Sequence, residues 1–435
     1  MDIITNPVFV AVVVLCILCL LKLNVLLSLI ISAMVGALLG GLDVQTAMDV
    51  LTAGFSVNAG TALAYLLLGT FATAIASTGL ADMISKKLTK VMGNKATVLL
   101  LILAGVTCLS QNLVPVHIAF IPIMIPPMLH LFNKLKVDRR AAACSLAFGL
   151  KAPYIAIPFG FGAIFMGIIA DNLTANGMTA TISDVASYNW ILAVAMFIGL
   201  MIAIFITYRK PRTYQDLEVD TSATEAVSDH ITRQHIVTIA AIIVVVAVQI
   251  PTGSLPLSAL CGLLVMFIFG AIKWNEIDDQ FAGGVKIMGM IAFIMLVAGG
   301  FADVIKATGA VDQLVQAAVA AMAGNKIVAA TIITLIGLLV TMGIGSSFST
   351  VPVLAVLYVP LCSSMGFSVP ATILLMSAAA ALGDAGSPAS DTTLGPTSGL
   401  NADGQHNHIW DTCVPTFLHF NIPLMLAAII CSQFI

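Results

Sequence analysis

The sequence predicts an all-α, polytopic membrane protein built from two inverted repeats, each with about five transmembrane helices, one helical hairpin and one broken helix. Three observations lead to this prediction. Of the 435 residues, 60% are hydrophobic and 9% are charged, so long apolar runs recur along the chain. A set of residues repeats after a shift of 230 positions. Lysine and arginine gather in particular loops and so indicate the sidedness of each half.

Apolar segments suited to membrane helices follow one another along the chain. In the first half they cover residues 8–21, 25–41, 61–77, 97–109, 113–132, 141–170 with an interruption, and 190–208. After a polar stretch at 209–234, a second series covers residues 236–250, 257–272, 287–305, 327–344, 351–362, 369–382 with an interruption, and 409–435. This pattern excludes a soluble domain, and no basic patch interleaved with aromatic residues points to nucleic acid.

The two series match each other in sequence. A shift of 230 residues superposes Asp49 on Asp279, Gly54 on Gly284, Gly69 on Gly299, Phe71 on Phe301, Thr78 on Thr308, Gly79 on Gly309 and Asp82 on Asp312. One inserted residue later, Gly93-Asn94-Lys95 meets Gly324-Asn325-Lys326. Chance matches in apolar sequence do not readily reproduce such motifs in order. We therefore predict a first repeat at 1–210, a cytoplasmic linker at 211–230 and a second repeat at 231–435.

The basic residues predict that the repeats are inverted. With Lys22 placed in the cytoplasm, all but three of the 18 lysines and arginines fall on that side. The exceptions are Lys306 and Lys326, which fall outside, and Lys151, which falls within the membrane. The loop at 86–95 is thus inside, whereas its repeat partner at 306–326 is outside.

The interrupted segments are the first candidate for a functional site. In the second half, Gly383, Gly386 and Pro388 break a helix around the acids Asp384 and Asp391. A broken helix with a buried acid is how many transporters hold a cation, although a polar loop at the membrane surface would have similar residues.

The first half has a matching interruption that carries a lysine. Aligning Gly149 with Gly383 sets Lys151 opposite Asp384 or its neighbour across the pseudo-symmetry axis. One reading is a structural salt bridge that locks the halves. The other is that Lys151 attracts a substrate carboxylate while Asp384 and Asp391 handle Na+ or H+.

Two hairpin tips form a second symmetric pair. The segments 97–109 and 113–132 are joined only by Ser110-Gln111-Asn112, and this hairpin is either re-entrant or fully spanning. The second tip runs from Gly345 to Thr350 and contains Ser346, Ser347 and Ser349. Small hydroxyl and amide groups of this kind can serve a cation or a carboxylate, but they are also common in ordinary interhelical turns.

Several histidines lie near these segments. His117 and His419 are in apolar surroundings, where a hydrogen-bonded core histidine is the simpler reading and a proton relay the other. We expect the run from Gln405 to His408 to be exposed, with both of its histidines solvated. Asp411 is a weak site candidate.

The string from Gly383 to Thr393 closely resembles the GD-x-x-SP-x-SDT signature of Na+/H+ antiporters of the NhaC type. The inverted halves with polar hairpins are similar to the wider ion transporter superfamily, which includes dicarboxylate carriers. At this length and with so short a linker, the chain most resembles the compact members thought to carry amino acids, and a buried Lys151 fits that branch.

The resemblance, taken with the polar tips and breaks, assigns two sets of residues. The cation-binding set is Asp384, Ser387, Ser390, Asp391, Thr392, Ser346 and Ser347. The substrate-binding set is Lys151, Ser110, Gln111, Asn112, Ser349 and Thr350. No cofactor or resident metal is expected beyond Na+ or H+ as the coupling ion.

We predict a secondary active transporter that couples Na+ or H+ to a small amino acid or carboxylate. The alternative is a Na+/H+ antiporter without an organic substrate. An intramembrane protease is rejected, because Ala381 stands where the GxGD motif needs glycine. The expected location is a bacterial inner membrane, in contact with lipid, and the resemblance alone suggests a homodimer.

Overall fold

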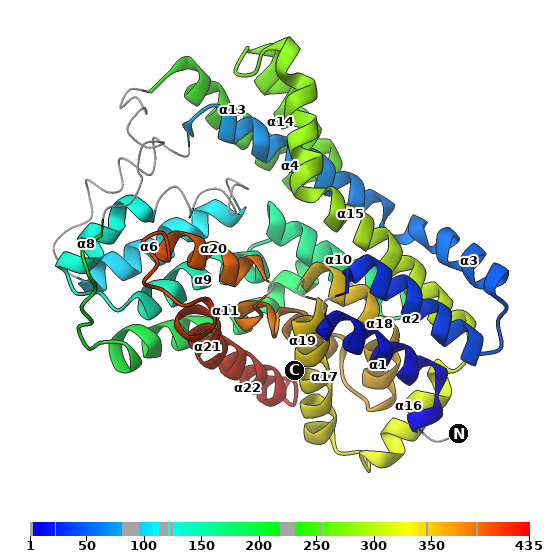
Figure 1. The fold of residues 1–435 in the computed structure, drawn as a ribbon. Coiled ribbons are helices and arrows are strands. Elements are labelled where there is room, and N and C mark those ends of the chain that lie inside the picture. Colours follow the sequence, from blue (N-terminus) through cyan, green and yellow to red (C-terminus); the bar gives the residue numbers. More distant parts are fainter. Residues whose placement is uncertain are drawn as a thin grey trace.

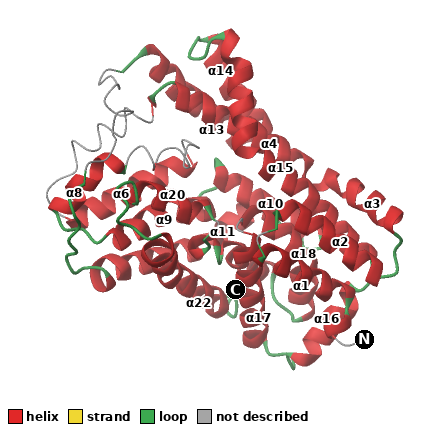
Figure 2. Cartoon of the chain, viewed as in Figure 1, coloured by secondary structure: helices red, strands yellow, loops and turns green. Residues whose placement is uncertain are grey.

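The computed structural model describes residues 3–21, 23–80, 96–112, 121, 125–217, 231–252, 254–344, 347–388 and 390–435 (Figure 1). Every regular element within these residues is a helix (Figure 2). The first half contains α1 (Pro7–Leu20), α2 (Val25–Leu39), α3 (Val44–Ala53), α4 (Ala59–Ser77), α6 (Ala96–Asn112), α8 (Leu129–Lys134), α9 (Arg139–Ala156), α10 (Phe161–Ala175) and α11 (Ile182–Ile202).

The second half contains α13 (Arg233–Thr252), α14 (Leu255–Ile268), α15 (Ile277–Ala307), α16 (Val311–Ala321), α17 (Lys326–Ile344), α18 (Ser347–Ser364), α19 (Val369–Ala381), α20 (Asp391–Leu400), α21 (Val414–Thr416) and α22 (Ile422–Cys431). Short 3₁₀ or π turns join or extend several of them: η2 (Gly54–Asn58), η4 (Ala203–Thr207), η6 (Asp384–Gly386), η7 (His408–Cys413) and η8 (Phe417–Asn421).

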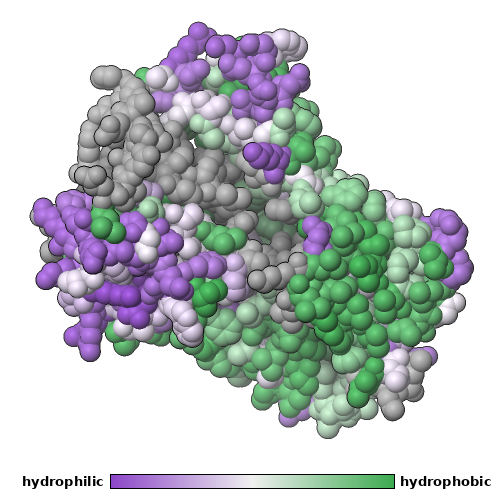
Figure 3. Space-filling model, viewed as in Figure 1, coloured by the Kyte–Doolittle hydropathy of each residue, from purple (hydrophilic) through white to green (hydrophobic). Residues whose placement is uncertain are grey.

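Three of the described helical stretches are long and apolar enough to cross a membrane: Ile182–Thr207, Met288–Ala307 and His408–Cys431. A fourth span arises if α9 and α10, which are bent by 49° at their junction, are taken together. Eight shorter apolar helices accompany them. Figure 3 shows an extended apolar surface over one part of the molecule, while polar surface gathers around α8. These features match the predicted all-α, polytopic membrane architecture.

The structure changes the extent of several predicted segments. The apolar run predicted at 287–305 belongs to α15, which begins already at Ile277. The segment that the 230-residue shift pairs with α15 is not one helix but three pieces, α3, η2 and α4. For the first hairpin, α6 forms one arm. The other arm was predicted at 113–132, and its residues 113–120 and 122–124 lie outside the described residues.

Helix α15 packs through glycines against α4 and against η2, the turn before α4 that begins at Gly54. A methyl group added at Gly54 would lie 2.7 Å from the Cα of Gly300 and 3.1 Å from the carbonyl oxygen of Gly299. One added at Gly69 would lie 2.9 Å from the carbonyl oxygen of Gly284. Position 54 therefore meets 299 while 69 meets 284, so the two helices run antiparallel. The contact is also reciprocal, because a shift of 230 residues turns one pair into the other.

Replacing Gly284 by alanine is expected to destabilise this contact, because the new methyl group would lie 2.6 Å from the Cα of Thr70. Backbone atoms cannot rotate away, so we expect a loss of about 1–3 kcal/mol, measured as a lower melting temperature in detergent. Gly60→Ala in α4 is the control, because no atom lies within 4 Å of the added methyl group. Equal melting temperatures for the two variants would contradict close packing at Gly284.

A second equivalence relates α6 and α9 to α17 and α19. A methyl group at Gly149 would lie 2.7 Å from the carbonyl oxygen of Ala104, and one at Gly383 would lie 2.9 Å from that of Leu338. One and the same shift along the sequence takes residue 149 to 383 and residue 104 to 338, so the two contacts occupy equivalent positions. In each half, the glycine at the interruption therefore packs in the same way against an earlier helix of that half, α6 for Gly149 and α17 for Gly383.

Candidate functional site

Two broken helices bring the site together. Helix α9 contains Pro153 and ends at Ala156, and Gly160, with a φ of 60°, lets the chain turn into α10. Helix α19 ends at Ala381, after which Gly383 adopts a φ of 83°, a left-handed conformation that a residue with a side chain rarely adopts. The predicted interruptions are thus present in both halves.

Five side chains meet where the two breaks face each other. Lys151 of α9 forms an ion pair with Asp384 of η6, and its ammonium group also donates to the hydroxyl of Ser347 at 2.8 Å and to that of Tyr154. Ser347, at the first position of α18, donates to Asp384 at 2.5 Å and lies 2.6 Å from the Tyr154 hydroxyl. Ser390, the N-cap of α20, donates to the other carboxylate oxygen of Asp384.

This cluster is held away from solvent. Lys151 is 0% exposed and Asp384 is 8% exposed. The ring of Tyr154 packs edge-on against Phe165 at 4.9 Å and lies 5.7 Å from the ring of Phe348. One positive and one negative charge balance each other, whereas removing either would leave the other buried without a counter-charge, at a cost of about 3–5 kcal/mol.

The structure brings together part of the predicted site. Lys151, Ser347, Asp384 and Ser390 form the ion-pair cluster. Ser387 instead donates to the carbonyl oxygen of Met342 at 3.4 Å, and the backbone N–H of Thr392 donates to Ser390. Thr350 is buried one turn beyond Ser347.

The other predicted residues lie outside what the structure describes. Ser346 is not described, nor are the side chains of Ser349 and Asp391. Helix α6 ends with the residues of the first tip, Ser110, Gln111 and Asn112. Their side chains are likewise outside the described part. Where the chain is described, no three His, Cys, Asp or Glu side chains gather as they would around a resident metal ion.

Tyr154 is the member of the cluster that the sequence analysis did not single out. Its hydroxyl lies 3.3 Å from the Asp384 carboxylate, in addition to its contacts with Lys151 and Ser347. A signal was present, since Tyr154 comes three residues after Lys151 and so shares its helix face.

A second polar network lies at the end of the molecule near α8. Arg139 is 0% exposed, and its two terminal guanidinium nitrogens each donate to one carboxylate oxygen of Asp403 at 2.6 Å. The linker lies over it, because the Arg139 guanidinium is 4.3 Å from the ring of Tyr214 and Arg212 pairs with Asp411 at 2.9 Å. Burial raises the pKa of Asp403, but the hydrogen bonds and charge of Arg139 outweigh it and hold that pKa below 3.8. Asp411 therefore belongs to this network and not to the ion-pair cluster.

The expectation that both histidines of the 405–408 run are solvated was wrong for His406. This side chain is 3% exposed, and its ring lies 2.7 Å from the hydroxyl of Thr412. His408 is partly buried and lies 2.9 Å from the carbonyl oxygen of Pro388. His419 is a hydrogen-bonded core histidine as the simpler reading had it, contacting the Pro415 carbonyl and Thr207, whereas His117 lies outside the described residues.

We expect the folded protein to lose stability as the pH falls from about 6.5 to about 4, partly through His406. Burial lowers the pKa of His406 from 6.5 to about 4, although the nearby Asp411 opposes this. Between these values the unfolded chain binds a proton that the folded chain does not, so the contribution is complete above pH 6.5 and is lost on acidification, by at most about 3 kcal/mol.

Melting temperatures measured across this pH range should fall less steeply for His406→Gln than for the wild type. His130→Gln is the control, because the His130 side chain is 75% exposed and its pair with Asp216 contributes little. Parallel curves for wild type and His406→Gln would contradict a buried neutral imidazole.

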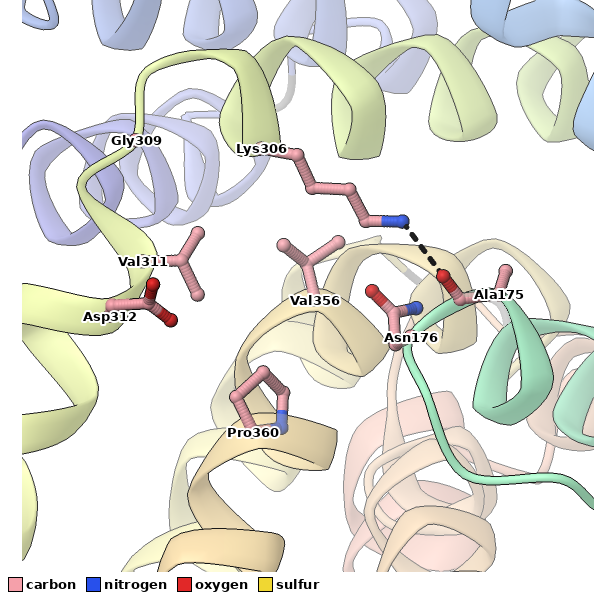
Figure 4. Close-up of a pocket in the computed structure, with 8 residues that line it drawn as sticks. All are labelled: Ala175, Asn176, Lys306, Gly309, Val311, Asp312, Val356 and Pro360. Carbon is pink, nitrogen blue, oxygen red and sulfur yellow. Dashed lines mark hydrogen bonds between the residues drawn. The ribbon is translucent and has the colours of Figure 1, made fainter.

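A cavity of about 320 Å³ lies away from the ion-pair cluster, between α10, α15, α16 and α18 (Figure 4). Lys306 reaches across it and donates to the carbonyl oxygen of Ala175 at 3.3 Å, at the C-terminal end of α10. Asp312 stands on its other side, in the first turn of α16, where the helix dipole favours an acid. Both charges thus have a local structural role, and we assign no ligand to this cavity.

Comparison with known sequences places the chain in a family. A sequence model described as the Na+/H+ antiporter family matches residues 145–429. A second, described as the Na+-H+ antiporter family, matches residues 6–92. The first match alone covers more than half of the chain and includes both Lys151 and the 383–393 string.

Relatives of similar length extend over nearly the whole chain. A membrane protein of Vibrio parahaemolyticus, uncharacterized by name, is 48% identical over 433 residues, covering 97% of this chain and 98% of the relative. One of Haemophilus influenzae, also uncharacterized by name, is 44% identical over 449 residues, with coverage of 99% and 100%. A protein of Bacillus subtilis named "Putative amino acid transporter YuiF" is 45% identical over 438 residues, with coverage of 97% and 98%.

Two solved transporters share the fold. The Alcanivorax borkumensis YdaH transporter superposes with a TM-score of 0.62 at 14% identity, over 89% of this chain and 87% of that chain. Neisseria gonorrhoeae MtrF, described as illuminating a class of antimetabolite efflux pumps, superposes with a TM-score of 0.58 at 16% identity, over 89% and 83%. The family and both neighbours are transporters, which confirms the prediction of transport and not catalysis. This protein is therefore an integral membrane protein that belongs to the Na+/H+ antiporter family.

Proposed function

We propose that this protein is a secondary active transporter that couples the movement of Na+ or H+ to that of a small amino acid or carboxylate. The observation that carries the proposal is the buried ion pair between Lys151 and Asp384, which joins the two broken helices. In this proposal Asp384 and Ser390 serve the cation, and Lys151 serves the carboxylate of the substrate. Asp391, Ser387, Thr392, Ser346 and Ser347 remain proposed cation ligands, and Ser110, Gln111, Asn112, Ser349 and Thr350 remain proposed substrate ligands.

Charge balance in a buried site gives a reason for coupling. A cation that took Asp384 alone would leave the Lys151 ammonium unpaired, and a carboxylate that took Lys151 alone would leave Asp384 unpaired. Either half-filled state costs about 3–5 kcal/mol, which is a factor of roughly 100 or more in its population. Binding both ligands restores neutrality, so the loaded site is favoured only when the cation and the organic anion are present together.

The alternative is a Na+/H+ antiporter without an organic substrate, and the name of the family favours it. In that reading Na+ competes with the Lys151 ammonium for Asp384, and the displaced lysine gives up its proton. The name of the Bacillus subtilis relative favours an amino acid instead. Because both readings use the same pair, they differ in whether an organic solute is needed.

We also propose that residues 1–210 and 231–435 are inverted repeats joined by the linker 211–230. The reciprocal, antiparallel glycine contact between α4 and α15 supports this, since a two-fold axis perpendicular to both helices produces such a pattern. The matching contacts of Gly149 and Gly383 support it as well. Alternating access would then open the site to one side or the other. The proposed location is the bacterial inner membrane, and a homodimer is proposed from family resemblance only.

Purified protein in liposomes tests the proposal. Uptake of each common L-amino acid and of succinate would be measured with and without an inward Na+ gradient, beside a pH-sensitive dye that reports proton movement. Gradient-dependent uptake of one of these solutes is expected. Na+-driven proton movement without any organic uptake would instead establish the antiporter alternative.

A further inference from the structure

Tyr65 of α4 is a buried tyrosine whose hydroxyl has no hydrogen-bond partner in the described part of the chain. Its side chain is 0% exposed, and its hydroxyl oxygen has no partner among the described residues. A phenol hydroxyl in water makes hydrogen bonds, so burying it unpaired costs about 1–3 kcal/mol. A phenylalanine at this position would fill the same space without that cost, so packing alone gives no reason for the hydroxyl.

The place of Tyr65 ties it to the ion-pair cluster. Its ring packs edge-on against Phe348, with 5.5 Å between the ring centroids and an interplanar angle of 86°. Phe348 directly follows Ser347, which bonds both Lys151 and Asp384, and it also packs against Tyr154 and Phe165. The unpaired hydroxyl therefore lies one aromatic ring away from the buried charges.

We propose that Tyr65 contacts the transported solute and that its hydroxyl donates a hydrogen bond to an oxygen of that solute. The aromatic rings of Tyr65, Phe348, Tyr154 and Phe165 would form the apolar wall of this subsite, and Lys151 its charged end. The fitting ligand class is a small organic carboxylate, including an amino acid, with its carbon chain against the rings. The inference rests on the proposed function, because it needs an organic solute at the Lys151 end.

Tyr65→Phe separates this role from a structural one. In proteoliposomes, the KM for the solute that the wild type takes up best, among the common L-amino acids and succinate, is expected to rise about tenfold or more. The half-saturating Na+ concentration should stay within a factor of two, because the hydroxyl is proposed to serve the solute and not the cation. The melting temperature should be unchanged or higher, since the variant removes an unpaired buried hydroxyl.

Tyr358→Phe in α18 is the matched control, because this tyrosine is also buried but its hydroxyl donates to the Ile333 carbonyl at 2.7 Å. It should lower the melting temperature and leave the KM unchanged, the reverse of the Tyr65 result. An unchanged KM in Tyr65→Phe, or a change in Na+ dependence alone, would overturn the inference while leaving the proposed transport intact. A wild-type protein that takes up no organic solute would instead overturn the proposed function and this inference with it.

Discussion

Replacing Lys151 by alanine is expected to abolish the uptake of organic solute into proteoliposomes. The side chain is fully buried, pairs with Asp384 and donates to Ser347, so its loss leaves a carboxylate without a counter-charge and removes the proposed anchor for the solute. An uncompensated buried charge costs about 3–5 kcal/mol, so uptake at a fixed solute concentration should fall roughly 100-fold or more. Initial uptake rates under a Na+ gradient measure this.

Lys326→Ala is the matched control, because this lysine is exposed, donates to the carbonyl oxygen of Gly366 at 2.6 Å and lies 5.4 Å from the ring of Phe367. Its uptake should stay within a factor of two of the wild type. The double variant Lys151→Met/Asp384→Leu removes both charges and should restore thermal stability without restoring uptake, which separates folding from transport. If Lys151→Ala retains Na+/H+ exchange with only a shifted pH profile, the antiporter reading holds and the role of Lys151 in solute binding is wrong.

Replacing Arg139 by alanine is expected to cause a large loss of stability. The guanidinium is buried, binds Asp403 through two nitrogens at 2.6 Å, and also donates to the carbonyl oxygen of Leu400 at 3.0 Å. Removing it leaves a carboxylate that is 1% exposed without its cation. We expect a loss of about 3–5 kcal/mol, measured by thermal unfolding in detergent.

Arg140→Ala makes a sensitive comparison, because the neighbouring arginine is 37% exposed and its partner Asp138, although only 3% exposed, keeps a second cation, Arg212, at 3.9 Å. That variant should cost less stability than Arg139→Ala, since the remaining carboxylate still has a counter-charge. Arg139→Met/Asp403→Leu, which removes both buried charges, should recover much of the stability lost in Arg139→Ala. If Arg139→Ala is at least as stable as Arg140→Ala, then the Arg139–Asp403 pair does not hold this end of the molecule together.

The sequence predicted the parts of the site that carry a local signal. Gly149 and Gly383 mark breaks in otherwise apolar segments, and a charge at membrane depth needs a partner, so the pairing of Lys151 with Asp384 was one of two stated readings. The tip residue Ser347 followed from its position between two helix ends, whereas Ser390 followed from the resemblance of the 383–393 string to the antiporter signature. The membrane class followed from composition alone.

The remaining features depend on how distant helices are rotated and packed, which a single sequence does not reveal. The hydroxyl of Tyr154 could be placed only once α9 was known to turn that face toward Asp384. Arg139 appears in sequence as one of a basic pair at a helix start, and nothing marks it as the partner of Asp403, 264 residues away. His406 appears in a polar run, and only the fold buries it under the linker. Tyr65 stands in an apolar helix, where an unpaired hydroxyl leaves no trace in the pattern.

The segment that we propose to be repeated in the two halves has two shapes. In the second half it is the single helix α15, whereas in the first half η2 interrupts it at residues 54–58. Under the proposed two-fold relation, either segment can adopt either shape, so the two halves show the two end states of one conformational change. When the protein opens to the opposite side of the bilayer, residues 54–58 would then become regular α-helix and the matching residues 284–288 would become a 3₁₀ turn.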